Sequence, residues 1–211
     1  MPPAEKDTRA KILEVAMRLF HEQGYHATGI STILREADVN SGSLYHFFPS
    51  KEALLVGVLQ LYVEGLRPMV IDHAEGATAE PLERVFALLN NYRLGMEMMG
   101  CSMGCPIGNL ALELSDNHTE VRQLIDLNFR NWCACVEKWL HDAGDRLPRD
   151  LDRAALSRFI LTIMEGAIMQ SRASRNLKAF DDSVAQLRDY FHRLSSAAAL
   201  ERGGRSSAST N

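Results

Sequence analysis

Between residues 28 and 48 the sequence places two short apolar segments on either side of a tight turn. The first segment repeats its apolar residues at the spacing of one helix face: Ile30, Ile33, Leu34 and Ala37. The second has a similar cluster before Pro49 ends it: Leu44, Tyr45, Phe47 and Phe48. Between them lies Asp38-Val39-Asn40. The pattern predicts two short helices, the first capped by Thr28 and the second by Asn40, in a helix-turn-helix.

The rest of the chain predicts an all-α protein of about nine helices. Apolar residues recur at steps of three and four, and β-branched residues are scattered. A helix over about 8–23 begins at Asp7 or Thr8 and ends at Gly24, and Ser50 caps a fourth helix that kinks or ends at Pro68. Further helices are expected over about 81–99, 109–114, from Asn117 or Thr119 to 144, 151–174 and 180–199. We expect a connection at 72–80 and a loop at 100–108.

These breaks predict three parts: a helix-turn-helix domain at 1–52, a second helical domain at 53–200, and a disordered tail at 201–211. The 211 residues are 46% apolar and 24% charged, which is typical of a globular protein. We find no apolar run of membrane-span length and no N-terminal stretch of signal-peptide length. A cytoplasmic protein without a membrane partner is expected.

A helix-turn-helix places its second helix in the major groove of double-stranded DNA. Leu44 and Phe48 are expected to pack inward, which turns the rest of that helix toward DNA. The predicted DNA contacts are Thr28, Ser41, Gly42, Ser43, Tyr45, His46 and Lys51. Thr28, Tyr45 and Lys51 are assigned to phosphates, and Gly42 to close backbone approach. Ser41, Ser43 and His46 are the candidates for reading bases.

Charge gives this interpretation no support. Over residues 1–52 six Lys and Arg face seven carboxylates, and the net charge of the chain is -4. The prediction of DNA binding therefore depends on residue placement alone.

The stretch from Thr28 to Glu52 closely resembles the tetracycline-repressor (TetR) family, above all at Asn40-Ser41-Gly42-Ser43-Leu44-Tyr45-His46-Phe47-Phe48-Pro49-Ser50-Lys51. Gly24-Tyr25 and Ala27-Thr28 extend the resemblance. It implies a homodimer in which 1–52 is a DNA-binding domain for a palindromic operator and 53–200 is an effector-binding and dimerisation domain, whose small effector releases the DNA. Gly29 departs from the family's frequent Thr or Ser, and Phe47 from its frequent His, with His46 one place earlier. Base preference is therefore not transferred.

The effector-binding residues must be sought in the C-terminal part. One expected helix face carries Val85, Leu89, Tyr92, Met96 and Met99, and another carries Ile125, Asn128, Trp132 and Val136. Facing each other, they would line an apolar pocket with a few polar groups, and the candidate contacts are Tyr92, Met96, Met99, Asn128 and Trp132. The alternative is that these residues are ordinary core. No basic cluster indicates a strongly anionic effector.

The cysteines support a second hypothesis. Cys101 and Cys105 lie four apart in the glycine-containing loop, where oxidation to a disulfide or capture of an electrophile would make a thiol-based sensor. They are otherwise structural or incidental. Cys133 and Cys135 point about 200° apart on a helix and cannot chelate jointly. No metal-ligand spacing, phosphate loop or base for a cysteine nucleophile is found, so no metal, no cofactor and no enzymatic activity are expected.

The last two expected helices carry wide apolar stripes, and small residues at Gly166, Ala167, Ala173 and Ala197 permit close approach. A four-helix bundle with a second copy would bury these stripes. The predicted dimer interface comprises Leu156, Phe159, Ile160, Ile163, Leu187, Tyr190 and Phe191. Burial within one subunit is the alternative.

Overall fold

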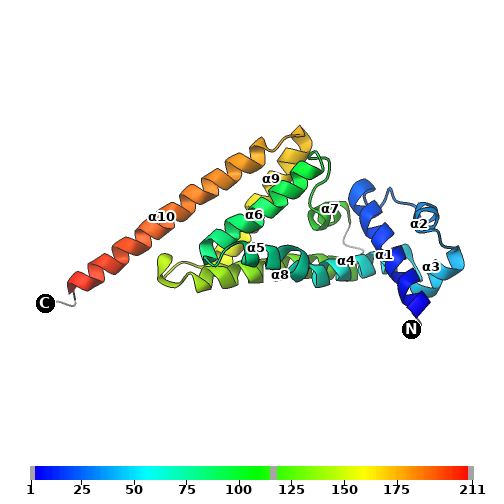
Figure 1. Cartoon of the computed structure of the whole chain (residues 1–211), viewed down its shortest axis with the longest axis horizontal. Coiled ribbons are helices and arrows are strands. Elements are labelled where there is room, and N and C mark those ends of the chain that lie inside the picture. Colours follow the sequence, from blue (N-terminus) through cyan, green and yellow to red (C-terminus); the bar gives the residue numbers. More distant parts are fainter. Residues whose placement is uncertain (1–2, 115–117, 209–211) are drawn as a thin grey trace. The chain divides into compact units, whose positions relative to one another are not determined.

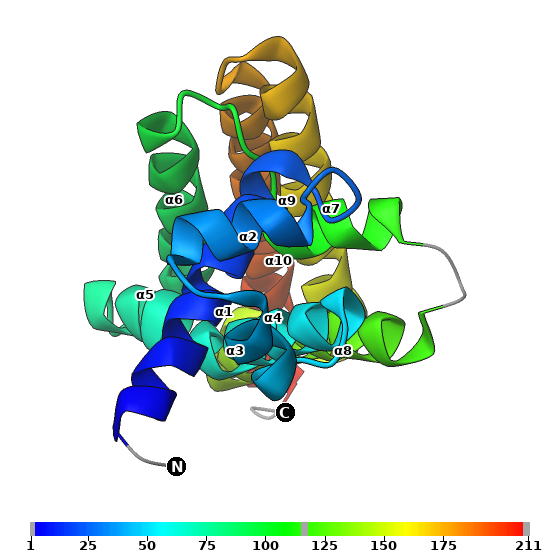
Figure 2. The ribbon, with the colours of Figure 1, turned by 90° about the vertical axis from the view of Figure 1, so that its right-hand side faces the viewer.

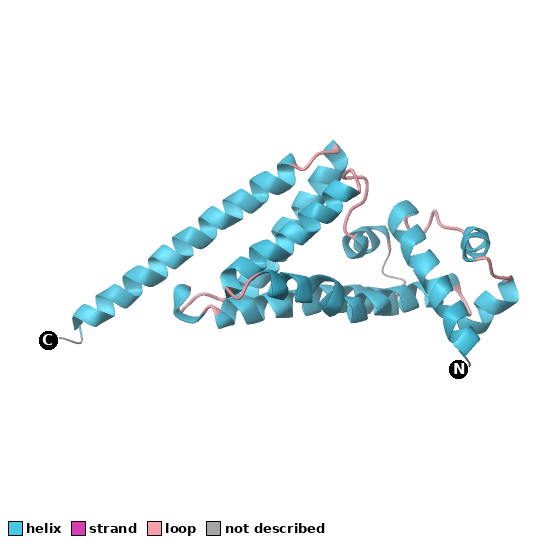
Figure 3. Cartoon of the chain, in the orientation of Figure 1, coloured by secondary structure: helices cyan, strands magenta, loops and turns pink. Residues whose placement is uncertain are grey.

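The computed structural model describes residues 3–114 and 118–208, and within these ranges it contains helices and loops but no strand (Figures 1 and 3). Its elements are α1 (Pro3–Gln23), α2 (Ile30–Ala37), α3 (Ser41–Phe47), α4 (Lys51–Leu66), a π-helical turn (Arg67–Ile71), α5 (Asp72–Ala77), α6 (Pro81–Met98), α7 (Pro106–Glu113), α8 (Thr119–Asp142), a 3-10 turn (Gly144–Arg146), α9 (Arg153–Ser174) and α10 (Lys178–Ala208). The predicted all-α class is confirmed.

Several helix boundaries correct the sequence-based expectation. α1 begins at Pro3, ahead of Asp7 and Thr8, and α5 occupies most of the stretch expected to be a connection. α7 begins at Pro106, since the Cys105 side chain caps it and a proline suits the first turn of a helix. α10 continues to Ala208, so the described part of the expected disordered tail is helical. Asn117, a suggested helix start, lies outside the described residues.

The predicted interruption at Pro68 is confirmed. α4 ends at Leu66, and the following turn has π-helical hydrogen bonding. Proline has no amide hydrogen and its ring crowds the preceding turn, so a regular α-helix does not continue through it.

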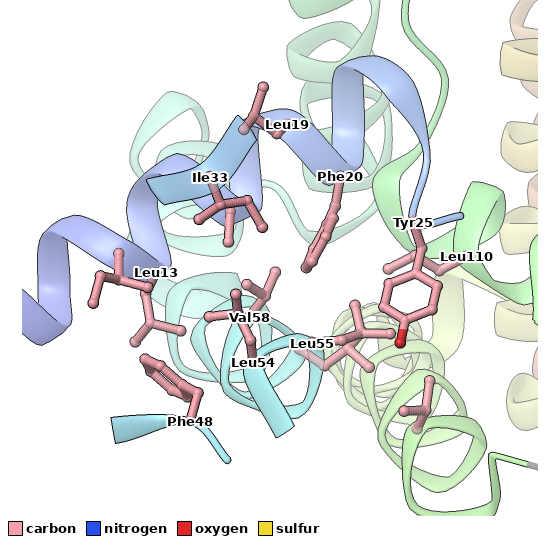
Figure 4. Packing of buried hydrophobic residues seen from close by; sticks show 14 of the residues in the cluster. Leu13, Leu19, Phe20, Tyr25, Ile33, Phe48, Leu54, Leu55, Val58 and Leu110 are labelled. Carbon is pink, nitrogen blue, oxygen red and sulfur yellow. The ribbon is translucent and has the colours of Figure 1, made fainter. Parts of the chain in front are cut away.

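The chain divides into two compact units, the first formed by residues 1–66 with 103–129 and the second by 67–102 with 130–211. This division differs from the predicted boundary after residue 52, because α4, α7 and the start of α8 share one apolar core with α1, α2 and α3. Figure 4 shows part of that core, including Phe20, Ile33, Phe48, Leu55 and Leu110. The helix-turn-helix is therefore built into a larger unit than the sequence indicated.

In the first unit α2 and α3 pack against α1 (Figures 1 and 2), and α4 passes close to it. Gly57 permits this approach. A Cβ atom at Gly57 would lie 2.9 Å from Cδ2 of Leu13 and 3.2 Å from the Phe48 ring, which is closer than packed carbon atoms tolerate.

The second unit has its own core. Trp139 is fully buried and its indole Nε1 donates to the carboxylate of Glu75 at 3.0 Å, while Phe86 and Phe191 meet edge to face. Four residues predicted for the dimer interface belong to the buried residues of this unit: Leu156, Ile160, Leu187 and Phe191. That part of the interface prediction is wrong, because these side chains are already covered within one subunit. Phe159 and Tyr190 are exposed, and Ile163 is half-buried.

One helical stretch of the described chain, Lys51–Ala77, is long and apolar enough to cross a membrane by length and composition. No such run was expected from the sequence. Leu54, Leu55, Val58 and Leu59 within it are fully buried in the core of the first unit. Packing inside the protein accounts for the apolar character of this part of α4.

Candidate nucleic-acid interface

The turn between α2 and α3 is fixed by local hydrogen bonds. Asp38 ends α2 in the left-handed conformation, with φ 49°, and the Val39 amide donates to the Leu34 carbonyl oxygen at 3.1 Å. The Asn40 side chain accepts from the Ser43 amide at 2.8 Å, which confirms Asn40 as the N-cap of α3. Phe48 is extended, as a residue before proline prefers to be.

α3 presents one face to the core and the other to solvent. Leu44 and Phe48 are buried as predicted, whereas Ser41, Gly42, Tyr45 and His46 are exposed and Ser43 is half-buried. Half of the Tyr45 surface is accessible, an unusual exposure for a large aromatic residue. These five residues are the α3 positions that were predicted to contact DNA, and their DNA contacts stay a prediction.

Thr28 corrects two predictions. Gly29 is the N-cap of α2 and makes no side-chain capping bond. The Thr28 side chain is fully buried, and its hydroxyl donates to the Gly24 carbonyl oxygen at 2.7 Å and is shared with the Leu19 carbonyl oxygen at 3.2 Å. A hydroxyl so placed is not available to a phosphate, and Thr28 instead ties the turn back to α1.

Lys51 is the first residue of α4, directly after Ser50, whose hydroxyl oxygen accepts from the Ala53 amide at 3.0 Å and so confirms the predicted cap. The ammonium of Lys51 lies over the Tyr25 ring, 4.3 Å from its centre. Burial lowers the pKa of Lys51, while the Glu113 carboxylate acts in the opposite direction. Lys51 is thus a cation held at a defined position beside the helix-turn-helix.

Glu113, the last residue of α7, is a further residue of this region that the sequence pattern did not indicate. Its carboxylate accepts hydrogen bonds from the backbone amides of Tyr25 and His26, which lie 88 and 87 residues earlier in the chain. No local periodicity or cap signal joins positions so far apart, although an acidic residue at the end of a helix is unfavourable for the helix dipole and could have raised the question.

The predicted effector residues do not form one site within a unit. Trp132 and Tyr92 meet in the second unit, where the indole Nε1 donates to the tyrosine hydroxyl oxygen at 3.2 Å. Met96 is buried and Met99 is exposed. Asn128 lies in the first unit and is buried, and its Nδ2 donates to the carbonyl oxygens of Leu59 and Leu124 at 3.3 and 2.9 Å. Its amide donor is committed to the backbone.

The second unit has a groove of about 660 Å³ on α6 and α10. It is lined by Ala77, Thr78, Glu83, Phe86, Ala87, Asn90, Arg93, Phe180, Asp181, Val184, Ala185 and Arg188. The guanidinium of Arg188 lies 3.8 Å from the centre of the Phe86 ring and donates to Glu83 at 2.8 Å. Arg93 donates to Asp181 at 2.7 Å. None of the effector residues chosen from the sequence lines this groove.

The four cysteines differ in environment. Cys101 is buried, with φ 53°, and its carbonyl oxygen accepts from Arg175 at 3.3 Å. Cys105 is half-buried, and its Sγ accepts from the Gly108 amide at 3.4 Å. Burial raises the pKa of the Cys133 and Cys135 thiols. Among the described residues no group of three or more His, Cys, Asp or Glu is arranged to hold a metal ion.

A capped pair of short helices with an exposed second helix, carried by an all-α chain, is typical of the helix-turn-helix class of DNA-binding proteins. Residues 12–58 match the family described as bacterial regulatory proteins, tetR family, and residues 81–187 match the tetracyclin repressor-like C-terminal domain. The chain belongs to the TetR family of DNA-binding transcriptional regulators.

Individual relatives agree with this family assignment. The transcriptional regulator LmrA of Bacillus subtilis is 30% identical over 81% of this chain and 89% of its own length. The transcriptional repressor DhaR of a Mycobacterium species is 29% identical over 84% of this chain and 89% of its own. The reduced form of Escherichia coli NemR has the same fold, with a TM-score of 0.74 at 22% identity, over 86% of this chain and 96% of that one.

Proposed function

We propose that the protein is a repressor that leaves a palindromic operator when a small, largely apolar effector binds its second unit. The observation that carries the proposal is the solvent-facing side of α3, set on a capped helix next to a cation at Lys51. The repressor mode is supported by the relatives, since DhaR and NemR are both named transcriptional repressors.

The groove on α6 and α10 is the proposed effector site. Its volume of about 660 Å³ falls in the range of small-molecule sites, and Phe86 and Val184 give it an apolar lining beside the polar Asn90 and Arg188. Tyr92, Met96 and Trp132 belong to the same unit but do not line the groove, and Trp132 together with Trp139 supplies the fluorescence that would report ligand entry. Asn128 and Met99 are left out, because one is committed to backbone and the other is exposed.

A homodimer acting in the cytoplasm completes the proposal. A palindromic operator has two half-sites, and in a symmetric dimer the helix-turn-helix of each subunit binds one of them. The exposed aromatic residues Phe159 of α9 and Tyr190 of α10 support a dimer built on these two helices.

Operator release by apolar compounds tests the proposal. The protein bound to a fluorescent duplex of its own upstream region is titrated with a panel of uncharged aromatic compounds, and duplex anisotropy and the emission of Trp132 and Trp139 are followed together. We expect at least one compound to release the DNA, and Val184→Glu to weaken this response by placing a charge in the groove. Met98→Glu is the control, since Met98 is highly exposed and does not line the groove. Release that is equal in all three proteins would reject the groove.

A second candidate function, the thiol sensor, is favoured by one observation. Cys105 Sγ caps the first turn of α7, so oxidation or alkylation of this sulfur would remove the cap from that helix. Peroxide oxidation of the Cys105 thiol to a sulfenic acid takes two electrons from the sulfur and yields one water molecule. We would compare operator release by peroxide and by N-ethylmaleimide in the wild type and in a Cys101→Ser, Cys105→Ser variant. Equal release would reject the sensor, and loss of release in the variant would support it.

A further inference from the structure

The turn that joins α1 to α2 is held by a carboxylate from α7. Oε2 of Glu113 accepts from the Tyr25 amide at 2.8 Å, and Oε1 accepts from the His26 amide at 2.5 Å. Both donors follow Gly24, which ends α1 with φ 89°, so neither continues the hydrogen bonding of that helix. One side chain thus satisfies two consecutive backbone donors with its two oxygens, which is a strong arrangement because the acceptor is charged.

The position of the carboxylate depends on the absence of a side chain at Gly24. A Cβ atom there would lie 3.0 Å from Oε2 and 3.2 Å from Oε1 of Glu113. Together with its positive φ, this close approach explains why glycine stands at this position. The carboxylate therefore lies directly against the backbone of the turn.

Other contacts bring the α7 segment to the same turn. Nε2 of His21 lies 2.7 Å from the carbonyl oxygen of Gly104, just before α7. Tyr25 and Leu110 belong to the same buried cluster, and Figure 4 shows the Tyr25 ring beside Leu110. All of these residues belong to the first unit. The end of α1 is thus fixed to α7 by polar contacts as well as by packing.

The turn in question determines where the helix-turn-helix begins. Five residues after Gly24 the N-cap of α2 is reached at Gly29, and the buried Thr28 between them donates back to Gly24. The Lys51 ammonium also lies over the ring of Tyr25. A displacement of Tyr25 and His26 would move the entry into α2 and the position of Lys51 together.

We infer that Glu113 is a positioning residue for operator binding: its carboxylate fixes the Tyr25–His26 turn and thereby sets the placement of α2, α3 and Lys51 against DNA. The inference rests on the DNA-binding role of the family and not on the proposed effector or its groove. Glutamine at position 113 keeps the size of the side chain but replaces one acceptor oxygen by an NH₂ group, which faces an N–H donor. It can satisfy one of the two amides and not both.

The test is Glu113→Gln in the full-length protein. We expect operator affinity to fall about tenfold, since hydrogen bonds to charged acceptors are among the strong ones. The slope of log affinity against log salt should stay unchanged, because no phosphate contact is removed. Amide exchange at Tyr25 and His26 should become faster, while that at Ser43, bonded to Asn40, should not. Glu120→Gln makes the same charge change at an exposed position of α8 and is the control.

The outcomes separate positioning from simple stabilisation. A lower melting temperature with operator affinity within twofold of the wild type would overturn the inference, as would equal losses in Glu113→Gln and Glu120→Gln. If Glu113→Gln does not fold, amide hydrogen exchange in the wild-type protein, measured with and without operator, tests the positioning role of Glu113. Protection of the Tyr25 and His26 amides that increases on operator binding supports the inference, and exchange at the rate of an unstructured peptide overturns it.

Discussion

The ammonium of Lys51 lies 4.3 Å from the centre of the Tyr25 ring, over its face. The ring is buried and the lysine half-buried, so this cation has a fixed position where most surface lysines move freely. A cation already ordered before DNA arrives loses less conformational entropy when a phosphate binds it. We therefore expect Lys51 to act as a preorganised phosphate anchor in the proposed interface.

Replacing Lys51 by alanine is expected to weaken operator binding about fivefold to tenfold at moderate salt and to reduce the salt slope by about 0.9, the value for one phosphate contact. Fluorescence anisotropy at salt concentrations from about 50 to about 200 mM measures both the operator affinity and the salt slope. Lys138→Ala removes the same charge from an exposed position of α8 in the second unit and should leave the slope unchanged. An unaltered slope in Lys51→Ala would remove Lys51 from the interface.

The same lysine should give operator binding an alkaline pH dependence. Burial lowers the pKa of Lys51 below its ordinary value of 10.5. Only the protonated amine attracts phosphate, so operator affinity is expected to fall as the pH rises through this lowered pKa, below 10.5. Folding stability responds in the opposite sense: the unfolded chain binds the proton more tightly, so this group's contribution rises with pH between the two pKa values. Lys51→Arg, which stays charged, should bind operator without this alkaline loss, and an identical loss in both proteins would contradict the assignment.

Thr28 is expected to matter for stability rather than for DNA contact. Thr28→Val keeps the shape but leaves the carbonyl oxygens of Gly24 and Leu19 without this donor, at a cost of about 1–2 kcal/mol in the free energy of unfolding. Urea denaturation followed by circular dichroism measures the loss, and operator affinity under native conditions should change less than twofold. Thr119→Val at an exposed position of α8 should change the stability little. A large loss of affinity with unchanged stability would restore Thr28 as a phosphate ligand.

Asn40 allows the cap and the charge of α3 to be separated. Asn40→Ala removes the acceptor for the Ser43 amide and should cost about 1 kcal/mol in stability. Asn40→Asp keeps a capping oxygen and should keep the stability, yet it places a negative charge at the start of α3. We therefore expect Asn40→Asp to bind operator more weakly than its stability predicts, increasingly so at low salt. Equal affinities of Asn40→Asp and the wild type at low salt would show that the start of α3 lies away from the phosphates.

The helix-turn-helix could be predicted closely because its signals are local. Gly24, Asn40 and Ser50 act on amides or carbonyls within a few residues, and the sequence shows such neighbours directly. Thr28 shows the limit of this reasoning. Its position before α2 suits an N-cap, but the same hydroxyl can turn back to the Gly24 and Leu19 carbonyls, and tertiary packing decides between the two.

The C-terminal sites could not be predicted because their partners are distant in sequence. Asn128 has the spacing of a pocket residue, yet its amide donates to Leu59, 69 residues away. In α9 both Phe159 and Ile160 are apolar, and periodicity alone does not say which is buried in the subunit; the structure buries Ile160 and exposes Phe159. Helices that are apolar on more than one side leave this choice to the assembled core.

Phe159 provides the test of the proposed dimer. Its ring and that of Tyr190 meet edge to face at 6.0 Å, joining α9 to α10, and they expose 48% and 38% of their surfaces. An aromatic pair exposed on two adjacent helices is typical of a contact surface. Phe159→Glu should convert a dimer to a monomer at micromolar concentration in analytical ultracentrifugation. Operator affinity should fall at least about tenfold, because each helix-turn-helix then binds its half-site independently and not as part of a dimer that binds both half-sites.

Met98→Glu is the matched control for Phe159→Glu, since it introduces the same charge at a more exposed apolar residue outside α9 and α10. The control should sediment as the wild type does. Both variants should keep the helical circular dichroism signal, because neither side chain belongs to the buried core. A wild-type protein that sediments as a monomer would contradict the proposed dimer. A Phe159→Glu protein that sediments as a dimer would place the dimer interface on another face, and the proposed role of α3 would not change.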